Sequence, residues 1–149
     1  MISITRTNSS NPDFINLVRL LDSYLAEKDG DEHLYYSQFN GIDQIKHVVV
    51  AYDKQKAVGC GAFKPMDHAS AEIKRMYVSP ESRGQEIGSK ILAELESWAV
   101  ALDFEKCMLE TGTRQPDAIA LYKKNGYSVI PNYGPYTTME NSVCFEKKL

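Results

Sequence analysis

The stretch of the chain best suited to chemistry is the segment SRGQEIGSKIL at residues 82–92. Arg83 offers a fork of N–H donors that suits phosphate, and Gly84 and Gly88 allow the backbone to come close to a ligand. The residues that follow are amphipathic, so the segment joins a strand to a helix, and the unpaired N–H groups of a helix start bind anions. Glu86 lies in the middle of this segment with the same charge as the expected ligand. Taken alone, the segment fits equally well a tight turn with an incidental arginine.

The apolar pattern on either side predicts the elements that must position this junction. Residues 47–63 hold two β-rich runs around the polar turn DKQK, which indicates a hairpin. In order, we expect a strand at 1–7, a helix from Pro12 to near Gly30, the hairpin, a strand at 71–78, a helix at 87–102, a strand at 106–110, the loop TGTRQ, a helix from Pro116 to Gly126, and strands at 127–130 and 142–149. This order is typical of an α/β fold around one mixed sheet. Residues 33–44 fit either a short helix or an ordered loop.

The strand expected at 71–78 contains an irregularity of parity. Ile73 has an odd number, whereas Met76 and Val78 have even numbers, so a regular strand cannot place all three on one face. One extra residue near Lys74 or Arg75 would bring them together, and we therefore predict a β-bulge there. The alternative is a strand that is buried on both faces and needs no alternation.

The composition is that of a globular protein without a surface for polyanions. A length of 149 residues is typical of one compact domain, so we expect a single domain over 1–149. The net charge is −3 and no block of Lys or Arg stands out, which argues against nucleic-acid and membrane partners. Because no apolar run approaches the roughly 20 residues of a membrane span, and the N-terminus lacks the apolar core of a signal peptide, we expect a cytoplasmic protein.

Cysteines and histidines do not occur in patterns that predict a disulfide framework or a metal site. The cysteines are odd in number and widely spaced among strand-like residues, which favours reduced, buried thiols. The histidines show no ligand spacing with one another or with cysteine, so we expect no metal. The residues concerned are Cys60, Cys107, Cys144, His33, His47 and His68.

Read together with its neighbours, the junction resembles a known family. The segment AEIKRMYVSPESRGQEIGSKIL, followed after one strand by AIALYKKNGY, resembles the GNAT superfamily of N-acetyltransferases, and the resemblance covers about residues 47–147. The family signature is Arg or Gln, two residues, Gly, one residue, then Gly or Ala. Arg83 and Gly88 match it and Gly84 fits the common Arg-Gly opening, whereas Glu86 takes the place of the first signature glycine. The resemblance implies a mixed, mostly antiparallel central sheet flanked by helices, with a splayed strand pair.

The resemblance also implies acetyl-CoA as cosubstrate. In the family, backbone N–H groups of the loop hold the pyrophosphate, so Glu86 can face solvent in the first turn of the helix, where a carboxylate is favoured. The strand before the loop holds the pantetheine arm and the acetyl carbonyl. Carried over to this chain, the coenzyme-binding residues are Met76, Tyr77, Val78, Arg83, Gly84, Gln85, Glu86, Ile87, Gly88, Ser89 and Asn125.

Catalytic roles follow from the same resemblance. Tyr122 matches the family tyrosine that often protonates the departing thiolate, although it could instead be an amphipathic core residue of its helix. Glu72 and Glu110 lie near the expected splay, where either could accept the proton of the attacking amine, bind a cationic acceptor or form a salt bridge. Of the two, Glu72 is the favoured base. We expect direct transfer in a ternary complex rather than through an acetylated cysteine.

The acceptor side carries less information. Tyr35, Tyr36, Tyr133 and Tyr136 offer aromatic walls for a cation or a planar ring, or are packing residues. We expect a primary amine of a small molecule, with a protein amine less favoured, and dimers are common among relatives of this kind. The rival interpretation is a non-catalytic acyl-CoA-binding module. Glu86 favours that module, whereas Tyr122 and the nearby carboxylates favour an enzyme.

Overall fold

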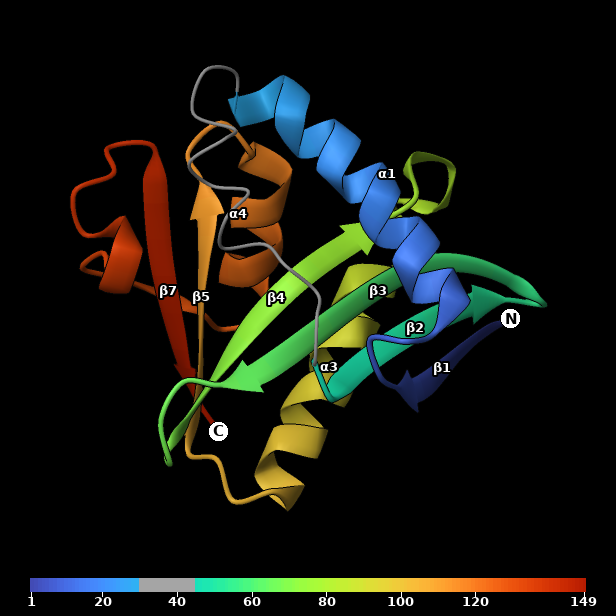
Figure 1. Ribbon diagram of the computed structural model, residues 1–149, viewed down its shortest axis with the longest axis horizontal. Coiled ribbons are helices and arrows are strands. Elements are labelled where there is room, and N and C mark those ends of the chain that lie inside the picture. Colours follow the sequence, from blue (N-terminus) through green and yellow to red (C-terminus); the bar gives the residue numbers. More distant parts are fainter. Residues whose placement is uncertain (30–44) are drawn as a thin grey trace.

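The computed structural model describes residues 1–29 and 45–149 (Figure 1). Its elements follow the order expected from the sequence, and the segment at 33–44 that fitted either a helix or a loop lies outside the described residues. The elements are β1 (Ile2–Thr7), α1 (Pro12–Asp29), β2 (His47–Asp53), β3 (Lys56–Pro65), β4 (Ser70–Val78), α3 (Ile87–Ala101), β5 (Lys106–Gly112), α4 (Pro116–Lys124), β6 (Ser128–Ile130) and β7 (Ser142–Lys148), with short 3-10 turns at Pro80–Ser82 and Gly134–Tyr136.

The strands form one mixed sheet in the order β1-β2-β3-β4-β5-β7-β6. The pair β4 and β5 is parallel and the other neighbours are antiparallel. Helix α1 crosses one face of the sheet and α3 lies behind the other (Figure 1). The expected architecture, a mostly antiparallel sheet flanked by helices, is therefore confirmed.

Helix α1 begins and packs as its sequence predicts. Asn11 caps the helix, because its side-chain oxygen accepts the backbone N–H groups of Asp13 at 2.8 Å and Phe14 at 3.2 Å, and Pro12 follows at the first helical position. Apolar residues three or four apart then form the face that is buried against the sheet. These residues are Phe14, Leu17, Val18 and Leu21.

Strand β4 carries the predicted bulge. The three residues 60–62 of β3 lie opposite the four residues 74–77 of β4. Within the bulge, Arg75 has a φ of 58°, in the left-handed region that few residues other than glycine adopt. Gly61 lies opposite, and a Cβ at this position would come within 2.5 Å of the Met76 sulfur. Glycine at position 61 therefore leaves room for the Met76 side chain beside the bulge.

The bulge has the effect on side chains that the parity argument requires. Ile73 belongs to the core cluster beneath α3, and Met76 and Val78 pack against the same cluster. The alternative of a regular strand buried on both faces is therefore wrong. The two residues between them, Lys74 and Arg75, are the ones displaced by the extra position.

The sheet opens between β4 and β5. The parallel pairing joins residues 70–72 to residues 106–108 and ends there, whereas β4 continues to Val78 and β5 to Gly112. The two strands then diverge, as Figure 1 shows. This is the splayed pair that the family resemblance implied.

Strand β5 is longer than the sequence pattern indicated. We expected it to end at Glu110 and a loop to follow, but Thr111 and Gly112 continue the ladder by pairing with Val143 and Ser142 of β7. The alternation of apolar residues stops earlier because this end of β5 borders the opening rather than the core. Helix α4 ends as expected, with Gly126 at a φ of 90° just after it.

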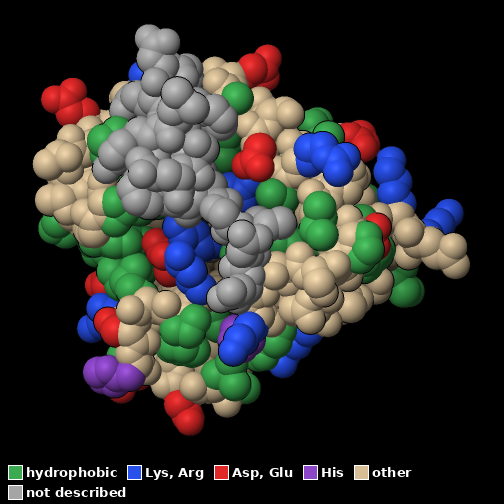
Figure 2. Space-filling model, viewed as in Figure 1, with side chains coloured by type: hydrophobic (Ala, Val, Ile, Leu, Met, Phe, Trp, Pro, Cys, Tyr) green, Lys and Arg blue, Asp and Glu red, His purple; other side chains and the backbone are tan. Residues whose placement is uncertain are grey.

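The surface carries no sign of a large single-charge field on the face seen in Figure 2, where basic and acidic side chains are interspersed. None of the helices in the described ranges is both long and apolar enough to cross a membrane.

Candidate functional site

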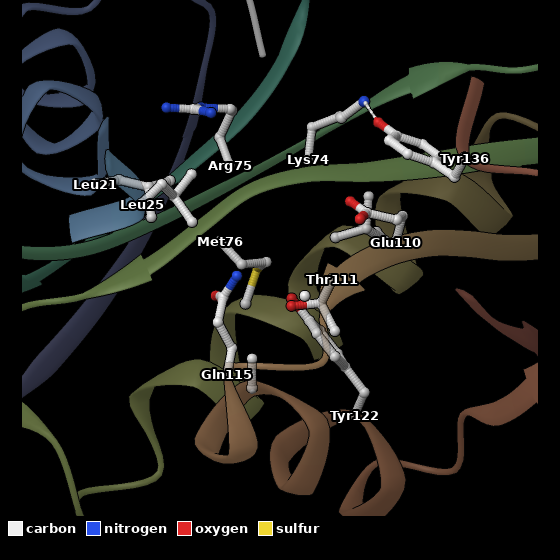
Figure 3. A pocket seen from close by; sticks show the side chains of 13 residues that line it. Leu21, Leu25, Lys74, Arg75, Met76, Glu110, Thr111, Gln115, Tyr122 and Tyr136 are labelled. Carbon is white, nitrogen blue, oxygen red and sulfur yellow. Dashed lines mark hydrogen bonds between the residues drawn. The ribbon is translucent and has the colours of Figure 1, made fainter. Parts of the chain in front are cut away.

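Two hollows meet where β4 and β5 separate. The larger is a groove of about 390 Å³ between the end of β4, the start of α3 and one side of α4. The smaller is a recess of about 100 Å³ between β4, β5 and α1, shown in Figure 3. They adjoin, because they share the lining residues Leu21, Met76, Gln115, Ala118 and Tyr122.

The loop before α3 presents backbone donors to the groove. Gly84 has a φ of 83° and Glu86 a φ of 63°, and α3 begins directly afterwards at Ile87. The N–H groups of the first helical turn have no acceptor within a helix, and no side chain caps this one. The groove is therefore lined by the positive end of a helix, which suits a phosphate.

Close packing of two helices explains the glycine of the first turn. A Cβ on Gly88 would lie 3.1 Å from a methyl carbon of Leu121 in α4. Glycine at this position lets the start of α3 approach α4, and both residues line the groove.

Glu86 turns its charge towards a partner. Both of its carboxylate oxygens accept hydrogen bonds from Lys124 Nζ, at 2.5 and 2.6 Å. These bonds and the charge of Lys124 hold the pKa of Glu86 below its usual range. The sequence suggested a residue facing solvent within the first turn; the structure places Glu86 at the N-cap, exposed but paired.

Arg83 is held at the other side of the loop. Its Nε donates to the carbonyl of Val78 at 3.0 Å, and its guanidinium lies 5.7 Å from the centre of the Tyr24 ring. Arg83 lines the groove, but part of its donor fork secures the loop to the end of β4. The end of β4 therefore determines the position of Arg83 in the groove wall.

Most of the residues expected to bind coenzyme lie together in the groove wall. Two do not: Gln85 is exposed in the loop, and Asn125 follows α4, where its side-chain amide donates to Ser89 Oγ at 3.0 Å and to the Leu121 carbonyl at 2.9 Å. Asn125 thereby ties α4 to α3. The residues that line the groove are Met76, Tyr77, Val78, Arg83, Gly84, Glu86, Ile87, Gly88 and Ser89.

Tyr122 stands at the junction of the two hollows. It rises from α4 towards Thr111 and Met76 (Figure 3), and its ring packs against Tyr127 and Phe145 with centroids 5.9 Å apart in each case. Burial, and then the charge of Glu110, raise the pKa of Tyr122 above its usual value. The residue is therefore both a core residue and a wall of the site, and its phenol remains protonated at neutral pH.

The two candidate carboxylates occupy different places. Glu110 lines the recess and accepts a hydrogen bond from Ser142 Oγ at 2.8 Å. Glu72 is the last residue of β4 that pairs with β5. Its carboxylate accepts a hydrogen bond from the Tyr133 hydroxyl at 2.8 Å and lies 3.6 Å from Lys74 Nζ. Glu72 is buried but is not part of either wall.

Of the four candidate acceptor tyrosines, Tyr136 lines the recess and is 3% exposed. The ring of Tyr133 packs against that of Tyr136 with centroids 5.9 Å apart, and its hydroxyl donates to Glu72. Tyr133 lines neither the groove nor the recess. Tyr35 and Tyr36 lie outside the described residues.

Sequence reasoning missed several residues of the site. Lys124 could have been noticed as a cation near the end of a helix, and Lys74 and Arg75 as the two charged residues at the predicted bulge. Thr111 and Gln115 gave no signal, because the sequence assigned them to a loop. The residues missed are Lys74, Arg75, Thr111, Gln115, Asp117 and Lys124.

The three cysteines are free and buried. Burial raises the pKa of the Cys60 and Cys107 thiols to about 12 and also raises that of Cys144. All three are therefore thiols rather than nucleophilic thiolates at neutral pH. Within residues 1–29 and 45–149, no three His, Cys, Asp or Glu side chains are grouped so that they could hold a metal ion.

Comparison with known proteins places this site in a family. The model of the acetyltransferase (GNAT) family matches residues 14–127. A protein described as an IAA acetyltransferase from Azospirillum brasilense is 34% identical over 99% of this chain and 98% of its own length. A crystal structure assigned to the acyl-CoA N-acyltransferases, from Klebsiella pneumoniae subsp. pneumoniae, is 34% identical with a TM-score of 0.84, covering 100% of this chain and 98% of that one.

A GNAT acetyltransferase of Elizabethkingia anophelis, solved with acetyl-CoA bound, shares the fold at a TM-score of 0.69 and 19% identity, over 99% of this chain and 98% of that one. The helix-start groove, the splay and the match over most of the chain agree. The chain therefore belongs to the GNAT family and is an acetyl-CoA-dependent N-acetyltransferase.

Proposed function

We propose that this acetyltransferase passes the acetyl group directly from acetyl-CoA to the primary amine of a small molecule, in a ternary complex. The observation that carries the proposal is the position of Tyr122, where the groove suited to a phosphate-bearing cosubstrate opens into a recess of about 100 Å³. A thioester reaching the end of the groove would meet an amine held in the recess.

The groove supplies the coenzyme site. Backbone N–H groups at residues 87–89 hold the pyrophosphate, and Arg83 borders it. Residues 76–78 of β4 lie beyond its pairing with β5, so the strand edge that faces the splay is available to the pantetheine arm. This arrangement aims the acetyl group at the splay.

Glu110 and Tyr122 each carry out one of the two proton transfers in the proposed reaction. The amine nitrogen attacks the thioester carbonyl, and Glu110 accepts the amine proton directly or through water. The C–S bond then breaks, and Tyr122 donates its phenolic proton to the departing thiolate. After the product leaves, Glu110 releases its proton to solvent and Tyr122 takes one up from solvent. Glu72 is the weaker candidate for the base, because it is held by Tyr133 outside the recess.

The volume of the recess favours a small acceptor over a folded protein surface. The relative named as an IAA acetyltransferase supports the same choice. The rival function, a non-catalytic acyl-CoA-binding module, rested on the charge of Glu86 beside the phosphate site. Pairing of Glu86 with Lys124 removes that argument.

Release of free coenzyme A thiol tests the proposal. The protein is given acetyl-CoA with polyamines, amino acids, aminoglycosides, aryl amines and peptides in turn, and Tyr122→Phe is compared with Tyr52→Phe, a remote tyrosine bound to Asp13. We expect turnover on one class of small amine that falls by about 10² or more in Tyr122→Phe and persists in Tyr52→Phe. Full turnover in Tyr122→Phe would contradict its role as the acid, and turnover confined to peptides would contradict the small acceptor.

Mass spectrometry tests the direct route. Protein treated with acetyl-CoA in the absence of acceptor should carry no acetyl group on Cys107 or Cys144. A stable adduct that an amine discharges would instead establish a covalent intermediate.

A further inference from the structure

The recess bears two adjacent positive residues on one side of β4. In a regular strand, neighbouring side chains point to opposite faces. Here the bulge interrupts the alternation, so Lys74 and Arg75 extend from the same side of β4 and Met76 from the other (Figure 3), and all three line the recess. Among the described residues, the lining of the recess therefore includes two cations from β4 and one anion, Glu110, from β5.

Arg75 has its charge balanced within the fold. Its side chain is 2% exposed and forms an ion pair with Asp22 of α1. Its Nε is buried and finds no hydrogen-bond acceptor among the residues that the structure describes. Arg75 thus fixes the bulge to α1, and Asp22 offsets its charge.

Lys74 is nearly buried and also has polar partners. Its side chain is 11% exposed, and its Nζ lies 3.3 Å from the Tyr136 hydroxyl and 3.6 Å from a carboxylate oxygen of Glu72. The second distance exceeds the 2.7–2.9 Å of a charge-assisted hydrogen bond. The Tyr133 hydroxyl donates to the same oxygen of Glu72 at 2.8 Å.

Burial affects the pKa of Lys74. Burial lowers the pKa of Lys74, and the nearby charges of Glu72 and Glu110 only partly oppose this, while Lys64 adds to it. A carboxylate arriving in the recess would stabilise the charged form, because an opposite charge within about 4–6 Å favours ionisation. The wall of the recess is therefore complementary to an anion at the Lys74 end.

The opposite wall is complementary to an amine. Glu110 comes from β5, across the splay from Lys74, so the recess offers an acceptor one anionic and one cationic contact. A plain amine uses only Glu110, and a diamine brings its second cation towards Lys74 and Arg75. An amine with a carboxylate on a short chain uses both walls.

Building on the proposed function, we propose that the acceptor is a zwitterion, a small amino acid whose amine faces Glu110 and Tyr122 and whose carboxylate binds Lys74 and the Tyr136 hydroxyl. Lys74 is then the residue that determines acceptor specificity. The small volume of the recess limits the chain between the two groups to a few carbon atoms.

Three acceptors of matched length test this proposal: 4-aminobutyrate, butylamine and 1,4-diaminobutane. We expect kcat/KM to be about 10- to 100-fold higher for 4-aminobutyrate than for either of the others. α-Amino acids and their amides repeat the comparison at a shorter spacing. Equal use of the carboxylate and its amine or amide analogue would overturn the proposal.

Variants of Lys74 test whether its charge causes the preference for 4-aminobutyrate. In Lys74→Gln, the ratio of kcat/KM for 4-aminobutyrate to that for butylamine should come close to one, mainly because KM for 4-aminobutyrate rises. Lys74→Arg should retain much of the preference. The control is Lys64→Gln on β3, which removes a charge that acts on Lys74 without lining the recess, and it should retain the preference. An equal loss on every acceptor in Lys74→Gln would show a structural role and contradict the proposal.

Binding measured without turnover separates this inference from the proposed function. Calorimetry on the coenzyme A-loaded protein should detect 4-aminobutyrate more tightly than butylamine. Selective binding with no acetyl transfer would refute the proposed reaction and keep the inference. Acetyl transfer without selectivity would refute the inference and keep the reaction.

Discussion

Both carboxylate oxygens of Glu86 lie within hydrogen-bonding distance of Lys124 Nζ, at 2.5 and 2.6 Å, and join the start of α3 to the end of α4. Glu86 adopts a φ of 63°, a conformation that glycine takes more easily, at the position where the family signature has glycine. The backbone of the loop thus keeps the conformation of a glycine while the side chain is turned towards Lys124. The negative charge beside the proposed phosphate site is paired with a cation on the same wall of the groove.

Two replacements of Glu86 distinguish the effect of its charge from the effect of its backbone conformation. Glu86→Gly removes both the charge and the strained φ, whereas Glu86→Gln removes the charge alone. We expect Kd for acetyl-CoA, measured by calorimetry, to stay unchanged or to fall by no more than roughly tenfold in each, because Lys124 becomes available to the phosphates. Lys124→Gln should raise Kd. A large loss of affinity in Glu86→Gly would show that Glu86 contributes positively to binding.

The fold could be read from the sequence where local pattern decides. The bulge is encoded in the parity of Ile73 and Met76, since the apolar residues of a strand report which face is buried. The partner of Glu86 could not be read in the same way, because Lys124 lies 38 residues away and meets it through the packing of two helices.

The choice between the carboxylates also depends on tertiary structure. Glu72 and Glu110 both belong to strands beside the splay, and the sequence favoured Glu72. The pairing of β4 with β5 ends at Glu72, which leaves Glu110 in the open part of the pair. The bulge and the packed helices determine the point at which β4 and β5 separate. The sequence of either strand alone therefore does not predict that point.

Glutamine variants of the two carboxylates should therefore differ. Glu110→Gln should lower kcat/KM by about 10² or more and change its dependence on pH, because the amine loses its proton acceptor. Glu72→Gln should retain most of kcat/KM and instead lower the free energy of unfolding by about 1–3 kcal/mol, since Tyr133 and Lys74 lose a charged partner. If both variants keep the pH profile of the wild type, neither carboxylate is the base.

Tyr127 should affect stability and not catalysis. Its hydroxyl donates to Glu96 at 2.9 Å, and Lys147 Nζ donates to the other oxygen of the same carboxylate at 2.9 Å. Tyr127→Phe removes a hydrogen bond to a charged group, so urea denaturation should show a loss of about 1.5–3 kcal/mol. The ring remains against Tyr122, and kcat should be preserved. Tyr122→Phe should show the opposite pattern, and a fall of kcat in both variants would mean that the hydroxyl of Tyr127 positions the acid.

His47 should make stability depend on pH. Its ring stacks on Phe63 at 4.6 Å and meets the edge of Trp98 at 4.9 Å, and its Nδ1 is buried without a hydrogen-bond partner in the described part of the chain. Burial, and then the charge of Lys46, lower the pKa of His47 below 6.5. The unfolded chain therefore takes up the proton first, so stability is complete above pH 6.5 and is lost as pH falls through the lowered pKa.

Because phenylalanine keeps the stack but cannot bind a proton, His47→Phe should resist acid better than the wild type. The difference in Tm between the two proteins should be constant at pH 7 and 8 and should shift in favour of the variant at pH 5. The exposed His68 provides the control, because His68→Gln removes one histidine without touching the ring stack. Parallel curves for the wild type and His47→Phe at every pH would show that folding of this protein is not linked to a proton on His47, and that the acid sensitivity arises elsewhere.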